Sequence, residues 1–240
     1  MLTAWGLVPA RGGSKSIPMK NLAVVAGRPL LDYGIRAAQR SGRLEKIFCS
    51  TDSKQIAQYA EYLGVLVDNR PESLCGDDVL VDDVVKDFLC RQQAVGESLP
   101  DLVVLIQPTS PFLLPEHIVS LLDEFEIRPR ALSGHTVVRV SHNCHAWNQR
   151  LIDAEGMAQF LFLEERNNAR IKQAKPQLFV FGNLIAARTN VLMSGLGFYA
   201  PPCLTVEIKR PFEFDLDGPD DLRTAEALLR SLTVKLPHLN

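Results

Sequence analysis

Basic residues and glycines follow the first apolar segment of the chain, in an arrangement typical of anion binding. In chain order they are Arg11, Gly12, Gly13, Ser14, Lys15 and Lys20. Glycine has no Cβ, so its backbone N–H can approach an anion closely, and cationic side chains around one turn form a positively charged seat. We therefore predict that this loop binds a polyphosphate, and with it a nucleotide. The loop matches neither a Walker A sequence nor a Rossmann fingerprint, and a turn with solvated lysines is the alternative.

Two aspartates alternate with apolar residues near the other end of the chain, in the segment 214–217. In an extended segment Asp215 and Asp217 would point to one side. Two carboxylates about 4 Å apart repel by roughly 4 kcal/mol at an effective dielectric near 20, and a divalent cation relieves this repulsion. Mg²⁺ takes oxygen ligands and shares its other positions with substrate phosphates. We predict a magnesium site here; the alternative is a surface Asp215 and a helix-capping Asp217.

The basic loop and the acid pair together predict nucleotidyl transfer. A metal ion at the acids would hold a triphosphate, and Arg11 with the two lysines would stabilise the charge that builds on the departing pyrophosphate. A module that only binds nucleotides is the alternative. The acid pair argues against it, because a binding module has little need of two carboxylates that repel each other.

Apolar segments at strand and helix spacing alternate through the first half of the chain. The pattern predicts strands at 4–9, 46–51, 65–67 and 102–107, and helices at 29–41, 53–63, 79–93 and 116–125. This rhythm is typical of an α/β fold in three layers, with a doubly wound, mostly parallel sheet. Ligands of such sheets bind at the carboxyl ends of the strands, where the basic loop and the segments 51–53 and 107–111 all lie.

The rhythm changes in the second half of the chain. Short strands are predicted at 136–140, 158–163 and 178–181, which makes 134–181 an antiparallel excursion from one domain spanning 1–240. Exposed apolar sheet edges need a partner, so we predict that the excursion forms a homodimer; a surface flap on a monomer is the alternative. The chain then returns with predicted strands at 204–208 and 213–217 and a helix at 218–232.

Composition argues against two classes of protein. A net charge of −2 does not favour nonspecific binding to nucleic acid. No apolar run is long enough to span a bilayer, and the N-terminus lacks the charged stretch of a signal peptide. The five cysteines form no C-x-x-C pair, which is typical of reduced thiols. We therefore expect a cytoplasmic protein with no membrane or nucleic-acid partner.

Five motifs occur in an order that resembles a known family. They are ARGGSKSIPMKN at 10–21, STD at 50–52, RPESL at 70–74, QPTSPFL at 107–113 and FDLDGPDDL at 214–222. They resemble the acylneuraminate cytidylyltransferase family, which contains the CMP-sialic acid synthetases and relatives for legionaminic, pseudaminic and deoxyoctulosonic acids. The resemblance implies a nucleotide-diphospho-sugar transferase-like fold. It also implies Mg²⁺-dependent transfer of CMP from CTP to the anomeric hydroxyl of a 2-keto-3-deoxy sugar acid, with release of pyrophosphate.

The resemblance also implies roles for the matching residues. Those expected to bind the triphosphate are Arg11, Gly12, Gly13, Ser14, Lys15 and Lys20. Asn21 and Arg70 would contact the ribose or cytosine, and Gln107 the sugar acid. Lys172 stands where many relatives have an arginine that meets the sugar or the partner subunit. Catalysis would fall to Arg11, Lys20 and the metal ligands Asp215 and Asp217, one of which would assist deprotonation of the attacking hydroxyl.

The chain departs from the family at positions near the expected sugar pocket. Val81 stands where relatives often have a serine that helps to recognise the nucleotide. Val180 replaces an arginine, and Gly182 and Asn183 reverse the Asn-Gly order of the relatives. Transfer of CMP to a deoxyoctulosonate or a phosphonate is therefore an alternative. A glycosyltransferase that uses a nucleotide-sugar is a further one, although it would usually place its metal-binding acids after a mid-sheet strand.

Overall fold

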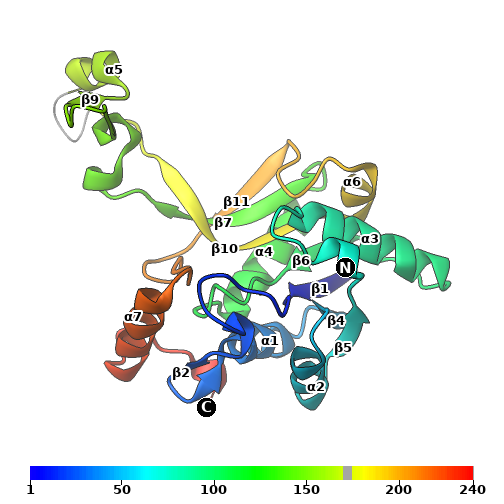
Figure 1. Cartoon of the computed structure of the whole chain (residues 1–240). Helices are drawn as coiled ribbons and strands as arrows, with labels where there is room; N and C mark the ends of the chain where they lie inside the picture. The colour runs from blue at the N-terminus through cyan, green and yellow to red at the C-terminus, as the bar shows by residue number, and fades with distance from the viewer. Residues whose placement is uncertain (170–174, 240) are drawn as a thin grey trace.

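Continuous apolar segments form the centre of the sheet. In the computed structural model, which describes residues 1–169 and 175–239, seven strands lie in the order β11-β7-β10-β6-β1-β4-β5 (Figure 1). They are β1 (Ala4–Pro9), β4 (Lys46–Thr51), β5 (Leu66–Asn69), β6 (Leu102–Leu105), β7 (Ser133–Arg139), β10 (Phe179–Arg188) and β11 (Cys203–Glu207). β5, β4, β1 and β6 are parallel, and β11 is parallel to β7. Only β10 runs antiparallel to its neighbours β6 and β7 in this sheet of described residues.

Helices cover both faces of this sheet. They are α1 (Leu30–Ser41), α2 (Lys54–Tyr62), α3 (Val81–Ala94), α4 (Pro115–Ile127), α5 (Leu163–Asn168), α6 (Thr189–Ser194) and α7 (Pro219–Arg230). Val8 of β1 packs with Leu31 and Ile35 of α1 in one buried cluster, and Leu7 packs with Phe88 of α3 in another. Neighbouring side chains of one strand thus enter opposite layers, and the predicted three-layer α/β fold is confirmed.

The predicted helices on the sheet agree with the observed ones to within two residues at each end. α1 ends at Gly42, whose φ of 62° lies in the left-handed region that glycine enters without strain. Short elements complete the first half: β2 (Val24–Val25), β3 (Arg28–Pro29) and the 3-10 helices η1 (Lys20–Leu22) and η2 (Glu72–Leu74). A further 3-10 helix, η6 (Pro237–Leu239), lies at the C-terminus. No helix within 1–169 and 175–239 has both the length and the hydropathy to cross a bilayer.

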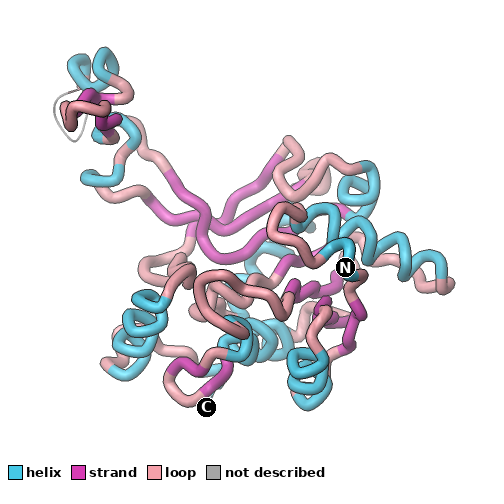
Figure 2. Tube along the Cα trace, viewed as in Figure 1, coloured by secondary structure: helices cyan, strands magenta, loops and turns pink. Residues whose placement is uncertain are grey.

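The paired outer parts of β7 and β10 extend past the other strands of the sheet and carry an arm, described over 140–169 and 175–178, that projects away from the rest of the chain (Figures 1 and 2). Its described part contains η3 (His142–Cys144), η4 (Ala146–Asn148), the hairpin of β8 (Arg150–Ile152) and β9 (Ala158–Phe160), and α5. The strand predicted at 158–163 is present only as β9 over Ala158–Phe160, because a turn follows and Leu163 begins α5. The strands predicted at 136–140 and 178–181 are the outer parts of β7 and β10, which pair with each other in the main sheet.

The strand predicted at 213–217 is wrong. Residues 211–213 form a turn and 214–217 have no regular secondary structure. The backbone N–H of Leu216 donates to the carbonyl of Thr109 at 2.8 Å rather than to a neighbouring strand. The alternation still has a physical cause, because Phe214 and Leu216 pack into a buried cluster with Phe112 while the intervening acids remain outside it. The alternation of apolar and acidic residues in 214–217 therefore reflects one buried face of an irregular segment and does not indicate a strand of a sheet.

Candidate active site

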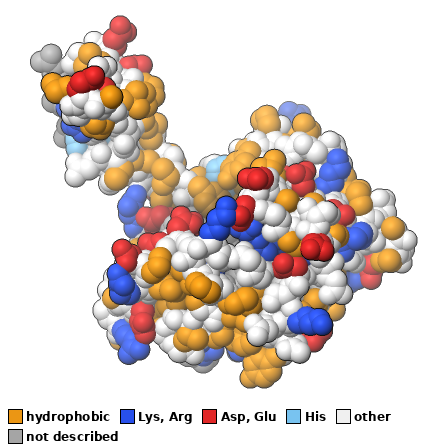
Figure 3. All heavy atoms as spheres, in the orientation of Figure 1, with side chains coloured by type: hydrophobic (Ala, Val, Ile, Leu, Met, Phe, Trp, Pro, Cys, Tyr) orange, Lys and Arg blue, Asp and Glu red, His pale blue; other side chains and the backbone are white. Residues whose placement is uncertain are grey.

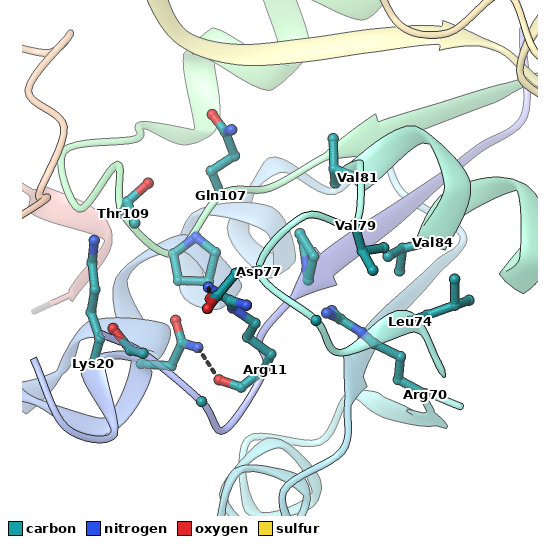
Figure 4. Close-up of a pocket in the computed structure, with 16 residues that line it drawn as sticks. Arg11, Lys20, Arg70, Leu74, Asp77, Val79, Val81, Val84, Gln107 and Thr109 are labelled. Atoms are coloured by element: carbon teal, nitrogen blue, oxygen red, sulfur yellow. Dashed lines mark hydrogen bonds and ion pairs between the residues drawn. The ribbon is translucent and has the colours of Figure 1, made fainter. Parts of the chain in front are cut away.

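A cavity of about 340 Å³ lies at the carboxyl ends of β1, β5 and β6 (Figure 4). Seven of the residues singled out from the sequence line it: Arg11, Gly13, Ser14, Lys20, Asn21, Arg70 and Gln107. Figure 4 shows Lys20 and Thr109 at one side of this cavity and Val79, Val81, Val84, Leu74 and Arg70 at the other, with Arg11 and Asp77 between them. The structure thus brings together three motifs that are far apart in the sequence.

The glycines of the basic loop serve different purposes. The N–H of Gly12 donates to the Asp52 carboxylate at 2.7 Å. A Cβ at Gly12 would lie 2.9 Å from the Cβ of Ser53, so glycine lets the loop pack closely against the end of β4. Gly13 has open space around it and lines the cavity. In this structure Gly12 therefore holds the loop in place with its N–H already engaged, whereas Gly13 faces the space where a ligand would lie.

The basic side chains of the loop already have an anionic partner. Arg11 Nη2 lies 2.7 Å from Asp77 Oδ1, and Lys15 Nζ lies 2.7 Å from Asp77 Oδ2. Arg11 also donates to the carbonyl of Cys75 at 3.3 Å. Hydrogen bonds from Lys15 and then Arg11 hold the pKa of Asp77 below its usual value. A carboxylate thus occupies part of the seat that the sequence assigned to phosphates.

Two buried polar side chains fix the walls of the cavity. The Asn21 amide donates to the carbonyl of Arg11 at 2.9 Å and holds the loop backbone. Arg70 donates from Nη2 to the carbonyl of Ser50 at 2.7 Å and from Nε to the Ser50 hydroxyl at 3.3 Å. Burial lowers the pKa of Arg70 below its usual value. Both residues line the cavity, and their contact with a ribose or cytosine stays a prediction.

Lys20 connects the basic loop to the acid pair. Its Nζ lies 3.7 Å from Asp217 Oδ1, and the Ser16 hydroxyl donates to the Asp217 carbonyl at 2.6 Å. The Asp217 side chain is 86% exposed. It does not cap α7, because the Asp221 carboxylate accepts from the N–H groups of Asp217 and Gly218 at 2.9 and 2.8 Å. The loop and the acids therefore lie at the same end of the molecule.

The two acids have different surroundings. Burial raises the pKa of Asp215, the Thr109 hydroxyl lowers it, and the charge of Asp217 raises it again. The charge of Asp217 therefore acts on Asp215, although the segment is not a strand, and the shared metal site stays a prediction. The described residues contain no cluster of three or more Asp, Glu, His or Cys side chains that would enclose a metal by itself. Neither Asp215 nor Asp217 lines the cavity itself, but Asp217 lies at ion-pair distance from Lys20, which does. Two carboxylates in this position fit Mg²⁺, which commonly binds one or two carboxylates together with substrate phosphates.

The remaining site predictions lie around the same cavity or outside the described residues. Gln107 follows β6 and lines the cavity. Val81 begins α3 and, with Val79 and Val84, makes that wall apolar. Lys172 lies outside the described residues.

Sequence reasoning did not include three contributors among the site residues: Asp52, Asp77 and Thr109. It placed only the segments 51–53 and 107–111, which contain two of them, at the ligand-binding end of the sheet. Asp52 and Thr109 stand inside the STD and QPTSPFL motifs, so their place after predicted strands was a usable signal. Asp77 follows RPESL, but nothing in the sequence distinguishes it from Asp78.

Most of the chain matches the sequence model of a known protein family. Residues 5–154 match the family model described as cytidylyltransferase. The chain belongs to the cytidylyltransferase family. It is therefore a nucleotidyltransferase enzyme, and the family predicted from the five motifs is confirmed.

Individual relatives of this cytidylyltransferase support the same assignment. It is 32% identical to the CMP-N,N'-diacetyllegionaminic acid synthase of Legionella pneumophila, over 93% of this chain and 94% of the relative. It is 30% identical to the N-acylneuraminate cytidylyltransferase of Oncorhynchus mykiss over 89% of this chain, but spans only 48% of that relative. A solved structure of CMP:2-keto-3-deoxy-manno-octonic acid synthetase complexed with CTP matches with a TM-score of 0.71 and 17% identity, over 96% of this chain and 99% of that one. This last likeness shows the fold.

Proposed function

We propose that this cytidylyltransferase transfers CMP from CTP to the anomeric hydroxyl of a nonulosonic, sialic-like acid, with Mg²⁺, and releases pyrophosphate. The observation that carries the proposal is the contact between Lys20 and Asp217, because it joins a cavity with cationic side chains in its lining to an acid pair. The names of the Legionella pneumophila and Oncorhynchus mykiss relatives support this class of sugar acid. The likeness to a synthetase complexed with CTP supports the cavity as the nucleotide site.

The basic side chains would bind the triphosphate and stabilise the leaving group. Arg11 and Lys15 would exchange Asp77 for phosphate oxygens, because all three groups lie within ion-pair distance in the structure. Arg11 and Lys20 would then hold the charge that develops on the departing pyrophosphate. Ser14 and Gly13 line the same cavity and would donate hydrogen bonds to the phosphates.

The acid pair would hold the metal ion. Asp215 and Asp217 are the proposed ligands, and the bound Mg²⁺ would neutralise triphosphate charge and make the α-phosphorus more electrophilic. One carboxylate of the pair would accept the proton of the attacking hydroxyl. The Thr109 hydroxyl beside Asp215 and the Lys20 ammonium beside Asp217 would orient the two carboxylates.

Selection of the sugar acid would involve the side of the cavity away from the acid pair. Gln107 is the proposed contact to the sugar, and Val81 makes the neighbouring wall apolar. Val180 carries no charge where relatives have an arginine, and its side chain is exposed. A deoxyoctulosonate is therefore the alternative acceptor, and direct assay with several acids separates the two.

The arm supports the predicted homodimer. Leu151 and Ile152 of β8 are 62% and 65% exposed, and Met157 beside β9 is 65% exposed. Figure 3 shows hydrophobic side chains at the surface of the arm. We propose that a second copy of the chain covers this surface. Light scattering on a sizing column should give twice the chain mass, and Ile152→Asp should give monomers; a monomeric parent would contradict the proposal.

The five cysteines, all within the described residues, are unpaired, which agrees with the predicted cytoplasmic location.

A pyrophosphate-release assay tests the proposed reaction. Purified protein is incubated with CTP, ATP, GTP or UTP and with N-acetylneuraminate, diacetyllegionaminate, pseudaminate or deoxyoctulosonate, with Mg²⁺ or with EDTA. We expect release only with CTP, Mg²⁺ and a nonulosonic acid, and mass spectrometry should detect the CMP-sugar. CTP binding without turnover on any acid would favour the nucleotide-binding module instead.

A further inference from the structure

Asn183 is a fully buried amide at the irregular part of β10. Its register with β7 shifts between Phe181 and Ile185, and Asn183 lies within this bulge with 0% of its surface exposed. The hydroxyl oxygen of Thr136 in β7 accepts from the backbone N–H groups of Asn183 and Leu184 at 2.9 and 3.0 Å. The neighbouring strand therefore fixes the backbone from which the Asn183 side chain extends.

Gly182, the residue before Asn183, has no space around it for a side chain. A Cβ at Gly182 would lie 2.5 Å from Thr136 Oγ1 and 2.9 Å from the Thr136 carbonyl carbon. Because Oγ1 also holds the bulge, it cannot move away without breaking those bonds. The Gly-Asn order, which is the reverse of that in relatives, thus places the amide at 183 and excludes it from 182.

Both N–H bonds of the Asn183 amide have acceptors. Nδ2 donates to the carbonyl of Phe212 at 2.8 Å and to Nδ1 of His117 at 3.0 Å. The N–H of Leu114 also donates to this Nδ1 at 3.3 Å, so Nδ1 carries no proton. Burial lowers the pKa of His117 to about 4, which keeps the ring neutral at neutral pH. The Asn183 amide is thus fixed by a buried acceptor on α4, His117 Nδ1, and itself fixes the carbonyl of Phe212.

The Phe212 carbonyl stands at the start of the segment that ends in the acid pair. This segment makes no strand ladder, and specific bonds hold it instead. The N–H of Leu216 donates to the carbonyl of Thr109, which lines the cavity, and the Ser16 hydroxyl donates to the Asp217 carbonyl. The bond from Asn183 holds the other end, and the Phe212 ring meets the His117 ring edge-on at 5.4 Å. Asn183 therefore connects the sheet to the segment from within the core.

We propose that Asn183 is a positioning residue for the magnesium site, acting through the Phe212 carbonyl on the separation of the Asp215 and Asp217 carboxylates. The inference rests on the proposed function, because that function assigns these carboxylates to the metal. Removing an outer contact that orients metal ligands typically weakens metal affinity by about tenfold to a hundredfold. The same range is expected when the Asn183 amide is lost.

The test measures metal binding directly. Asn183→Leu removes both N–H donors at similar volume. Electron paramagnetic resonance of free Mn²⁺ gives the dissociation constant of Mn²⁺ from the complex of the full chain with CTP. We expect it to rise at least about tenfold, together with the Mg²⁺ concentration for half-maximal pyrophosphate release. Binding of CTP without metal should stay within about twofold, because Asn183 does not line the cavity. A purely structural role would move both affinities or neither.

Two control variants separate positioning from loss of stability. His117→Asn keeps an acceptor near the position of Nδ1, and we expect Mn²⁺ affinity within about threefold of the parent. Leu192→Ala removes a buried side chain on α6, beyond the opposite end of β10. It should lower thermal stability and leave Mn²⁺ affinity unchanged.

The outcomes are distinct. An unchanged Mn²⁺ dissociation constant in folded Asn183→Leu overturns the positioning role. If that variant does not fold, Asn183→Ser replaces it, since a serine hydroxyl is too short to reach Phe212; if neither folds, Asn183 is a folding residue and the proposal is wrong. A parent protein that neither binds Mn²⁺ with CTP nor releases pyrophosphate contradicts the proposed function itself, whatever the variants do.

Discussion

Lys20 Nζ lies 3.7 Å from Asp217 Oδ1, although the two residues come from opposite ends of the chain. Lys20 belongs to the η1 turn after β1 and lines the cavity, whereas Asp217 precedes α7. Ser16 makes a second connection through the Asp217 carbonyl. A substitution of either Lys20 or Asp217 should therefore affect the same site, so the effect of a single substitution on activity reports on that site.

Asp217→Ala should abolish turnover and leave the fold intact. Loss of a metal ligand removes several kcal/mol of transition-state stabilisation, so we expect kcat to fall at least about a hundredfold. The side chain is 86% exposed, so the free energy of unfolding should change by less than about 0.5 kcal/mol. Initial rates at saturating Mg²⁺ measure the fall in kcat, and urea unfolding measures the free energy of unfolding. Asp220→Ala, on the exposed first turn of α7, is the control. A variant within about tenfold of the parent would remove Asp217 from the metal site.

Arg11→Ala should lower kcat for CTP more than it raises KM. Charge builds on the leaving pyrophosphate in the transition state, so a group that acts there lowers kcat when it is removed. We expect a fall of about a hundredfold. Steady-state kinetics at several CTP concentrations measure the split, with Lys15→Ala, whose side chain is 81% exposed, as the milder comparison. If only KM changes, Arg11 binds the nucleotide without stabilising the transition state.

Asp77→Asn should bind CTP more tightly than the parent. Asp77 pairs with Arg11 and Lys15, and a triphosphate must displace it from both cations. Because these ion pairs are partly exposed, the gain is modest, and we expect the dissociation constant of CTP to fall about two- to fivefold. Isothermal titration calorimetry measures it, with Asp78→Asn as the matched control. Weaker binding in Asp77→Asn would mean that Asp77 supports the bound nucleotide instead of competing with it.

The protein should lose stability as the pH falls from about 6.5 to about 4. Burial lowers the folded-state pKa of His117 from its usual 6.5 to about 4, so in this range the unfolded chain binds a proton that the folded chain does not. The stabilisation is complete above pH 6.5 and decreases towards pH 4, by about 3 kcal/mol from this residue. Urea unfolding at several pH values measures the slope. The parent minus His117→Asn difference isolates His117 from His135 and His238, whose pKa values burial also lowers. Equal slopes in parent and variant would contradict the assignment.

Sequence patterns predicted the parts of the fold that follow from local chemistry. The helices on the sheet have regular apolar faces, and Gly42 and Pro219 mark their ends, so their bounds agree closely. The apolar run that predicted a strand at 102–107 forms β6 over Leu102–Leu105, and all of β6 is buried. The segment 213–217 had the right period, but the N–H of Phe214 closes a local turn onto the Pro211 carbonyl, and the N–H of Leu216 donates to Thr109, a tertiary partner far away in the sequence. No local pattern contains that information.

The candidate site shows the same division. The proximity of the basic loop to the acid-pair segment could be inferred from charge and spacing, and the structure shows it in the contact of Lys20 with Asp217; the roles of these residues stay predictions. Asp77 and Asn183 could not, because their importance depends on which groups the fold places beside them. The Gly182–Asn183 order was visible as a departure from the family, and only the contact with Thr136 explains it.

The pairing of Asp77 with the basic loop has a consequence for how fast CTP arrives. Arg11, Lys15 and Lys20 carry three positive charges, and Asp77 and Asp217 offset two of them. The mouth of the cavity therefore presents a weak net field to an approaching polyanion, and long-range steering is small. Stopped-flow association rates for CTP should consequently vary little with ionic strength, so encounter depends on diffusion and on the opening of an internal ion pair.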